Sequence, residues 1–279
     1  ALLGIPLVGS YHTELGPYAL QLTRDLVIAE AMGLYVDWFY RRCDTVLAPT
    51  QAVADALVER GVTTTPAVWG RGVDTDWFTP ERRREVFVDA QRAPVTILSV
   101  GRVSPEKRLD LLLDAFGRVV SRVPGLRLVV VGDGPARADL ERAAPEVTFL
   151  GELHGAQLAD VYAWADIFAF PSTTDTFGQV LLEAGASQLP VVAATAGGAA
   201  DLVVHGVTGL LVPPDDAHAF AEALEHLATA AEFRRRLGAA GRSAALRRTW
   251  GRSVEELKAA YARVVADELP ARSRPAVAA

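Results

Sequence analysis

Two carboxylates lie eight residues apart in the stretch TTDTFGQVLLEAGA, residues 173–186. The hydrophobic pattern predicts a strand that ends at Pro171, a short polar loop, and a helix that begins at about Gly178. In an open α/β sheet such a loop lies at the carboxyl end of its strand, where ligands bind. Asp175 would face the crevice ahead of the helix, and Glu183 would lie just over one turn inside it. Two acceptors in one crevice suit a ligand with several hydroxyl groups, such as a sugar.

A pair of cations follows an earlier predicted strand, in the loop VGRVSPEK, residues 100–107. Gly101 permits close approach of the backbone to a ligand. Arg102 and Lys107 flank the turn before the next helix, so both could converge on one anion at that helix N-terminus. The chain has 26 arginines and only two lysines, Lys107 and Lys258, which slightly favours a use for the compact ammonium group. The loop lacks a GxGxxG or Walker pattern, which disfavours a nicotinamide or kinase site.

Each of these signals also has a purely structural interpretation. Surface cations are common, and carboxylates near a helix start stabilise it through the macrodipole. Gly132 and Gly134 of VVVGDGP, which end another strand, could form an ordinary turn. The purely structural interpretations are disfavoured when the three loops are considered together, because all three follow strands of one predicted sheet. Cations for a diphosphate and carboxylates for hydroxyls would meet along one edge, which describes a nucleotide-sugar site.

Composition narrows the class of protein. A chain of 279 residues, half of them hydrophobic, suggests one large or two ordinary domains. A net charge of −6 gives no long-range attraction to nucleic acid. Cys43 is the only cysteine, so no intrachain disulfide can form. The sequence shows no signal-peptide pattern and no apolar run of about 18 residues. We therefore expect a cytoplasmic protein with no nucleic-acid partner.

The elements that would position the site alternate from residue 93 onward. Short runs of Val, Ile and Leu alternate with helical patterns, which predicts a parallel, doubly wound α/β sheet. The expected strands are 95–100, 127–131, 147–150, 167–170, 191–194 and 209–212. The expected helices are 107–120, 136–143, 157–163, the helix of Glu183, a short helix after Gly197-Gly198, 217–229, 232–248 and 253–268.

The first 80 residues follow a different pattern. They predict about three strands (5–9, 45–49 and 66–69) and helices over 18–42 and 51–60. Three strands are too few for a complete doubly wound layer, so we expect residues 1–80 to be the C-terminal part of a domain whose start is missing. We further expect a donor-binding domain over 81–250, a helix over 251–269 that packs back toward the first domain, and a disordered tail over 270–279.

Six motifs in order resemble the retaining glycosyltransferases of family 4. They are SYHTEL, GRGVDTDWF, GRVSPEKRLDLLLDAF, VVGDGP, TDTFGQVLLEAGASQLPVVA and HGVTGLLVPP. The resemblance extends from about residue 6 to residue 263, and it is strongest to the GDP-mannose-dependent α-mannosyltransferase and sulfoquinovosyl-diacylglycerol synthase branch. It implies the GT-B fold of two Rossmann-like, doubly wound domains, the first incomplete in this chain. Members of the family carry further residues before the equivalent of SYHTEL.

The resemblance implies a role for each polar residue of the predicted site. Arg102 and Lys107 would grip the donor diphosphate. Glu183 matches the second glutamate of the family's Glu-x7-Glu motif and would hold the ribose hydroxyls. Asp175 occupies the first position and would contact the donor sugar. It replaces a glutamate, and the missing methylene could lengthen a hydroxyl contact by about 1.5 Å; we interpret it as a subgroup variant.

The resemblance adds residues that the spacing alone does not single out. The backbone of Phe177, Gly178 and Gln179 would approach the sugar and phosphate. Gly132 would lie beside the nucleobase. His12 would lie near the transferred sugar, so that with Arg102, Lys107 and Asp175 it forms the expected catalytic group.

The expected activity is transfer of a hexose, mannose from GDP-mannose, to an acceptor hydroxyl on a glycolipid or glycan. A UDP-sugar-dependent transferase and a non-catalytic nucleotide-sugar-binding module are the alternatives. Asp74-Thr75-Asp76 spells a metal-binding Asp-x-Asp, but it lies in the predicted linker, and we interpret it as a turn. We expect no metal and no cofactor, because two cations and a helix N-terminus can offset the leaving diphosphate. Residues 19–42, with an aromatic and basic end, have two interpretations: an amphipathic core helix, which is the more common case, and peripheral contact with the inner face of a membrane.

Overall fold

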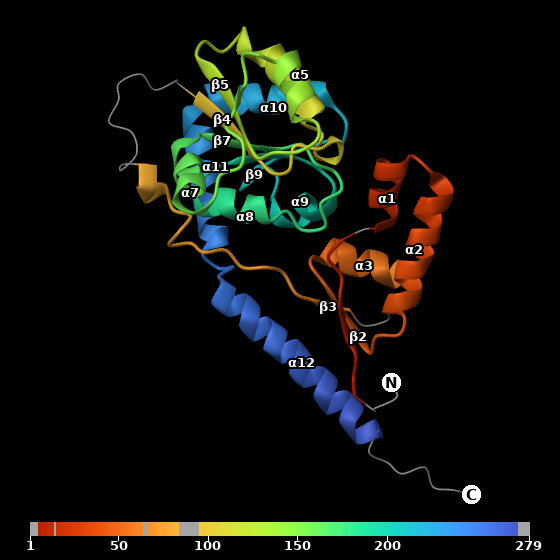
Figure 1. Ribbon diagram of the computed structural model, residues 1–279. Coiled ribbons are helices and arrows are strands. Elements are labelled where there is room, and N and C mark those ends of the chain that lie inside the picture. The colour runs from red at the N-terminus through yellow and green to blue at the C-terminus, as the bar shows by residue number, and fades with distance from the viewer. Residues whose placement is uncertain (1–4, 14, 64–65, 84–94, 273–279) are drawn as a thin grey trace, which may run out of the picture. The chain divides into compact units, whose positions relative to one another are not determined.

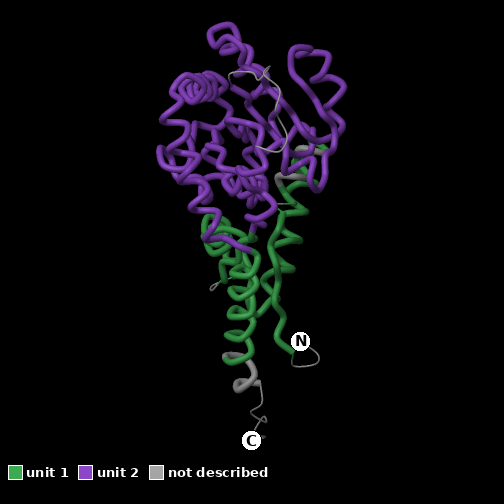
Figure 2. Tube along the Cα trace, turned by 90° about the vertical axis from the view of Figure 1, so that its left-hand side faces the viewer, with its two compact units in different colours: residues 1–72, 250–279 green, residues 73–249 purple. Residues whose placement is uncertain are grey.

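The computed structural model describes residues 5–13, 15–63, 66–83 and 95–272. The chain divides into two compact units, residues 1–72 with 250–279 and residues 73–249 (Figure 2). These bounds are close to, but not the same as, the expected domains 1–80, 81–250 and 251–269. The assignment of those domains to acceptor and donor stays a prediction.

The unit 73–249 is built on six parallel strands in the order β6-β5-β4-β7-β8-β9. The strands are β4 (Val95–Val100), β5 (Leu126–Val131), β6 (Thr148–Phe149), β7 (Ile167–Phe170), β8 (Val191–Ala194) and β9 (Gly209–Val212). In chain order this sheet runs 3-2-1-4-5-6, the order of doubly wound dinucleotide-binding sheets. The predicted α/β class is therefore confirmed. The strand order reverses between β4 and β7, so the crevice at their carboxyl ends is the topological switch point.

Helices cover both faces of this sheet, which explains why its strands are almost uninterrupted runs of apolar residues. Neighbouring residues on a strand point to opposite faces. Helices α5 (Leu109–Val120) and α10 (Ala217–Thr229) lie on one side of the sheet, and α7 (Gly155–Trp164), α8 (Gln179–Ala186) and α9 (Gly197–Leu202) lie on the other (Figure 1). Ile97 accordingly belongs to the core cluster of α5 and α10, whereas Leu98 belongs to that of α7, α8 and α9. The unit also contains α6 (Arg137–Ala143), α11 (Ala231–Ala245) and the 3-10 turns η1 (Pro80–Arg82) and η2 (Pro105–Lys107).

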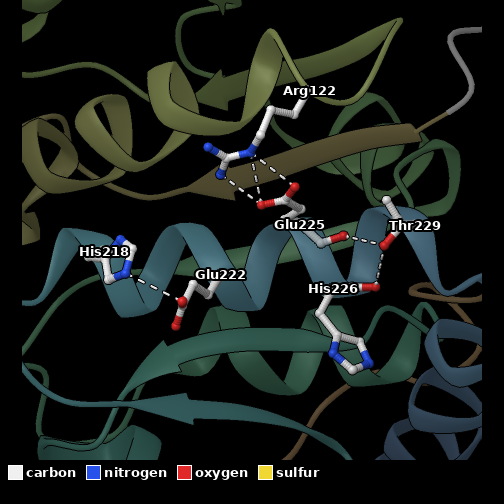
Figure 3. Close-up of polar contacts among 6 residues, drawn as sticks. All are labelled: Arg122, His218, Glu222, Glu225, His226 and Thr229. Atoms are coloured by element: carbon white, nitrogen blue, oxygen red, sulfur yellow. Dashed lines mark hydrogen bonds and ion pairs between the residues drawn. The ribbon is translucent and has the colours of Figure 1, made fainter.

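Apolar burial holds α10 against its neighbours more than its polar contacts do. Arg122, just beyond α5, makes an ion pair with Glu225 of α10 at 2.7 Å (Figure 3). Both side chains are substantially exposed, at 51% and 33%, and such surface pairs contribute little to stability. Phe220 and Leu224 of the same helix are in contrast almost completely buried in the core. The helix is thus positioned by its apolar face.

Several predicted boundaries move by a few residues. The helix expected over 107–120 begins only at Leu109, because Arg108 adopts a left-handed backbone conformation (φ 51°) after the separate turn η2. The strand expected over 147–150 is reduced to Thr148–Phe149. Helix α12 (Trp250–Arg272) extends into the expected tail, so residues 270–272 are helical. Residues 273–279 lie outside the described residues.

The unit containing residues 1–72 has three parallel strands in the order β1-β2-β3. They are β1 (Val8–Ser10), β2 (Thr45–Ala48) and β3 (Ala67–Val68), accompanied by α1 (Leu15–Thr23), α2 (Leu26–Tyr40) and α3 (Gln51–Glu59). The single helical segment expected over 18–42 is therefore wrong. The chain breaks at Arg24 (φ 55°), and the Asp25 side chain caps α2 by accepting from the backbone N–H of Val27 at 2.8 Å.

Helix α12 is joined to this unit near its start. The indole N–H of Trp69 donates to the backbone oxygen of Ser253 at 3.0 Å, and the Ser253 hydroxyl donates to the Gly70 oxygen at 2.7 Å. Ser253 is only 4% exposed, so these bonds are shielded from water. Within the described residues, no helix combines the length and the apolar character needed to cross a bilayer.

Candidate functional site

The loops that carry the predicted cations and carboxylates leave the same edge of the sheet. Strands β4 and β7 are direct neighbours, with Ile97 paired beside Ile167, and both run in the same direction. The loop after β4 leads through η2 to Lys107, and the loop after β7 leads through Asp175 to α8. The topology therefore brings both loops to the switch point, as the sequence predicts.

Lys107 and Asp175 form an ion pair at this point. The Lys107 Nζ atom lies 2.6 Å from Asp175 Oδ1, although 68 positions separate the two residues. Both side chains are mostly buried, at 26% and 22% exposed. The other carboxylate oxygen, Asp175 Oδ2, is buried and has no hydrogen-bond partner among the described residues. Such an oxygen carries a desolvation cost that a ligand hydroxyl would remove by donating to it.

A glycine pair after β8 supports the loop that bears Asp175. The Gly198 N–H donates to the Asp175 backbone oxygen at 2.7 Å. A Cβ on Gly198 would lie 2.1 Å from the Phe177 oxygen, and one on Gly197 would lie 2.4 Å from the Asp175 oxygen. Sequence reasoning identified this pair only as a turn. The same rule that located the other loops, carboxyl ends of parallel strands meeting at one edge, could have found it.

The glycines after β4 and β5 have different surroundings. A Cβ on Gly132 would lie 1.9 Å from the Gly101 oxygen, and one on Gly134 would lie 2.3 Å from the Val103 oxygen. These two glycines are therefore required for the two loops to pack. A Cβ on Gly101 would meet no atom within 4 Å, so its α-carbon faces open space. Contact of Gly132 with a nucleobase stays a prediction beside this packing role.

Glu183 of α8 accepts a hydrogen bond from a residue that the sequence did not indicate. Its Oε2 atom lies 2.9 Å from the Tyr162 hydroxyl of α7. Burial raises the pKa of Glu183 above its ordinary value, and the Tyr162 hydrogen bond opposes that rise. Burial also raises the pKa of Tyr162 well above its ordinary value, so the hydroxyl keeps its proton and remains a donor.

The segment between Asp175 and α8 is anchored in the core by Phe177, and the residues that follow it are partly buried. The Phe177 side chain is 5% exposed and packs with Val73 and Leu182. Gly178 has φ 80° and precedes the first residue of α8, Gln179. The side chain of Phe177 is thus committed to the core. The approach of the Phe177, Gly178 and Gln179 backbone to a sugar and phosphate stays a prediction. Arg102, on the loop after β4, is exposed.

His12 belongs to the other unit, so its place at this site stays a prediction. Its Nε2 atom lies 2.8 Å from the Ser10 hydroxyl, and its ring lies edge-on to Trp69. Burial, and then the positive charge of Arg71, lower the pKa of His12 below 6.5. The imidazole is therefore neutral near pH 7.

The Asp74-Thr75-Asp76 segment forms the expected turn. Asp74 Oδ1 accepts from the backbone N–H groups of Asp76 and Trp77 at 3.1 and 2.9 Å. In the part of the chain that the structure describes, no group of three or more His, Cys, Asp and Glu side chains is placed to hold a metal ion. The independence of the reaction from metal stays a prediction.

Comparison with known proteins agrees with this geometry. Residues 1–77 match the family described as Glycosyltransferase Family 4, and residues 94–230 match Glycosyl transferases group 1. A GDP-mannose-dependent alpha-mannosyltransferase of Mycobacterium tuberculosis is 37% identical over 267 residues, covering 93% of this chain and 67% of that protein. Sulfoquinovosyl transferase SQD2 of Arabidopsis thaliana is 32% identical, covering 92% of this chain and 52% of that protein. This chain thus spans between about half and two thirds of their length.

Solved structures show the same architecture. Sucrose-phosphate synthase from Thermosynechococcus elongatus superposes with a TM-score of 0.79 at 26% identity, covering 93% of this chain and 68% of that one. Anabaena Alr3699/HepE in complex with UDP superposes with a TM-score of 0.76 at 25% identity, covering 92% of this chain and 72% of that one. With its two family matches, its relatives above 30% identity and its GT-B neighbours, the chain belongs to the family-4 glycosyltransferases.

Proposed function

We propose that the crevice at the carboxyl ends of β4 and β7 binds a nucleoside diphosphate hexose, and that the protein transfers this hexose to an acceptor hydroxyl. The observation that carries the proposal is the pair formed by Lys107 and Asp175. A cation for the diphosphate and a carboxylate with one unsatisfied buried oxygen lie 2.6 Å apart at the switch point of the sheet. Glu183, on the helix that follows, supplies a further acceptor for the ribose hydroxyls.

The donor we propose is GDP-mannose. The support is the sequence similarity to GDP-mannose-dependent alpha-mannosyltransferases, at 37% and 36% identity over more than 90% of this chain. A UDP-sugar is the second candidate, because the structural relative Alr3699/HepE is described in complex with UDP and with UDP-glucose. The two candidates differ in the nucleobase, so direct comparison of GDP and UDP distinguishes them.

The reaction we propose proceeds with retention at the anomeric carbon. The bond between that carbon and the diphosphate oxygen breaks, a bond to the acceptor oxygen forms on the same face, and the acceptor proton passes to the departing phosphate. Lys107 and Arg102 offset the charge of the leaving diphosphate, which is electrostatic stabilisation that needs no metal. Asp175 has one oxygen committed to Lys107, so we assign it to orienting the sugar through the other oxygen.

The acceptor we propose is a hydroxyl on a glycolipid or glycan, reached through peripheral contact with the inner face of a membrane. Helix α2 supports lipid contact, because several of its large apolar side chains are at least half exposed. These are Leu26, Val27, Leu34, Tyr35 and Trp38. Replacing Val27 and Leu34 with serine should reduce co-sedimentation of the chain with anionic phospholipid vesicles, and equal co-sedimentation would argue against this surface.

Calorimetric titration of the chain with GDP and with UDP, with and without Mg²⁺, tests the donor site. We expect metal-independent binding of one nucleotide, and loss of this binding in Lys107→Ala and in Glu183→Ala. Lys258→Ala is the matched control, because the other lysine is exposed and, among the residues that the structure describes, pairs only with its helix neighbour Glu255 at 2.7 Å. It should bind as the unaltered chain does.

The outcomes separate the parts of the proposal. Binding that survives Lys107→Ala would contradict the assignment of that residue to the diphosphate. Binding that requires Mg²⁺ would contradict a metal-free site. Absence of binding to either nucleotide by a chain with an intact circular dichroism spectrum would overturn the donor site itself.

A further inference from the structure

Tyr162 is packed next to Glu183, a residue of the proposed donor site. Its side chain is completely buried. One face of the ring stacks on Phe168 of β7, with centroids 5.6 Å apart and planes at 23°. The ring also meets the ring of Phe78 nearly perpendicularly, at 5.4 Å and 88°. Contacts from two separate segments thus fix the direction in which its hydroxyl points.

That hydroxyl points at one oxygen of Glu183. The distance from the Tyr162 oxygen to Glu183 Oε2 is 2.9 Å, and it is the one hydrogen bond to this carboxylate from the described residues. A phenylalanine would pack equally well between Phe78 and Phe168. The hydroxyl therefore adds something other than packing, and its partner is a residue of the proposed site.

A second contact joins the segment that packs on the Tyr162 ring to the helix that bears Glu183. Arg242 Nη1 of α11 donates to the backbone oxygens of Phe78 and of Ala186, the last residue of α8, at 3.0 and 2.7 Å. One guanidinium therefore links the segment that holds the Tyr162 ring to the end of α8. The Tyr162 ring and the Glu183 carboxylate are therefore held in a fixed position relative to each other, which a positioning role requires.

We propose that Tyr162 is a positioning residue for recognition of the donor ribose. Its hydroxyl holds Glu183 Oε2, which leaves Oε1 to accept from a ribose hydroxyl, and keeps the carboxylate in one rotamer. The conformational entropy of the Glu183 side chain is then already lost in the free protein, so nucleotide binding does not have to order it. This inference rests on the proposed function, because it needs a ribose-containing nucleotide in the crevice.

Tyr162→Phe removes the hydroxyl and keeps the packing. The affinities of the unaltered chain and the variant are measured by calorimetry for GDP, for UDP and for the 2′,3′-dideoxy form of the nucleotide that binds more tightly. We expect the variant to bind the ribonucleotide about 3- to 10-fold more weakly, the effect of about one hydrogen bond. The dideoxy nucleotide, which lacks the hydroxyls that Glu183 would hold, should bind both proteins equally. Tyr261→Phe, an exposed tyrosine of α12, is the matched control.

The pH dependence supplies a readout that packing alone would not move. Loss of the Tyr162 hydrogen bond removes a contribution that lowers the pKa of Glu183. Affinity for the ribonucleotide should therefore begin to fall at a higher pH in Tyr162→Phe as the solution is acidified.

Three results would overturn the inference. Equal weakening for the ribonucleotide and the dideoxy nucleotide would mean that Tyr162 only supports the fold. Equal affinity of variant and unaltered chain for the ribonucleotide would mean that its hydroxyl does nothing for recognition. Failure of the unaltered chain to bind any nucleotide would refute the proposed function itself, and it differs from the other two results because no variant is needed to see it.

Discussion

Adding one methyl group at Gly198 should weaken nucleotide binding while the chain stays folded. In the Gly198→Ala variant the new Cβ would lie 2.1 Å from the Phe177 oxygen and 2.4 Å from its carbonyl carbon. A Cβ essentially never approaches another heavy atom closer than 3.0 Å, so this contact must open from 2.1 Å by about 0.9 Å. The atoms that must move are backbone, and they belong to the segment that we assign to the sugar and phosphate.

The size of the effect follows from the short range of hydrogen bonds. Donor–acceptor distances extend over only about 2.7–3.2 Å, so a displacement of about 0.9 Å breaks a bond made by this backbone. A hydrogen bond to a charged phosphate contributes about 1.5–3 kcal/mol, and about 1.4 kcal/mol corresponds to a tenfold change in affinity. We therefore expect roughly 10- to 100-fold weaker binding. The crowding itself should lower the stability by about 1–3 kcal/mol.

Calorimetry with the preferred nucleotide measures the affinity, and circular dichroism with thermal melting checks the fold. Gly117→Ala is the matched control. Gly117 lies exposed within α5, and a Cβ there would meet no atom within 4 Å. The same chemical change should leave binding unaltered there and raise the stability by about 0.4–1 kcal/mol. A Gly198→Ala chain that is folded and binds within twofold of the unaltered chain would refute the reasoning, because the segment would then tolerate displacement or lie away from the nucleotide.

Three further outcomes test individual contacts. Arg242→Ala orphans three backbone carbonyls and should lower the unfolding free energy of residues 73–249 by about 2–4 kcal/mol. Hydrogen exchange of β4 peptides measures this loss. Arg235 forms an exposed ion pair with Glu232 on the same helix, so Arg235→Ala should lower the unfolding free energy by less than about 0.5 kcal/mol. Because burial raises the pKa of Glu183, the folded state binds its proton more tightly, so stability falls as pH rises through that pKa. Glu183→Gln should remove this decline. In urea titrations near pH 7 without nucleotide, the variant should therefore be more stable than the unaltered chain. A decline in the variant that equals or exceeds that of the unaltered chain would contradict this explanation. His12 should titrate by NMR below pH 6.5, and Arg71→Gln should raise its midpoint; an unchanged midpoint would exclude that charge as a cause.

The local pattern of the sequence determined the element types in residues 95–249. Runs such as VTILSV and IFAF are buried on both faces, so their strand character is visible without any partner. Alternation with helices implied parallel strands, and parallel strands place the loops of Lys107 and Asp175 at one edge. Local signals failed where a single backbone conformation decided the outcome. The break at Arg24 and the late start of α5 after Arg108 depend on left-handed residues that are neither glycine nor asparagine.

Only the tertiary structure decided which side chains meet at that edge. The strand order 3-2-1-4-5-6 makes β4 and β7 neighbours, and this is why Lys107 and Asp175, expected to have separate tasks, form one ion pair. The packing of Gly198 on Phe177 and the hydrogen bond from Tyr162 to Glu183 likewise join loops and helices that are distant in sequence. Periodicity reports which face of an element is buried, whereas these contacts depend on distances across the fold. The sequence thus determined the fold class and the edge where the site lies, and the three-dimensional packing decided how its residues hold one another.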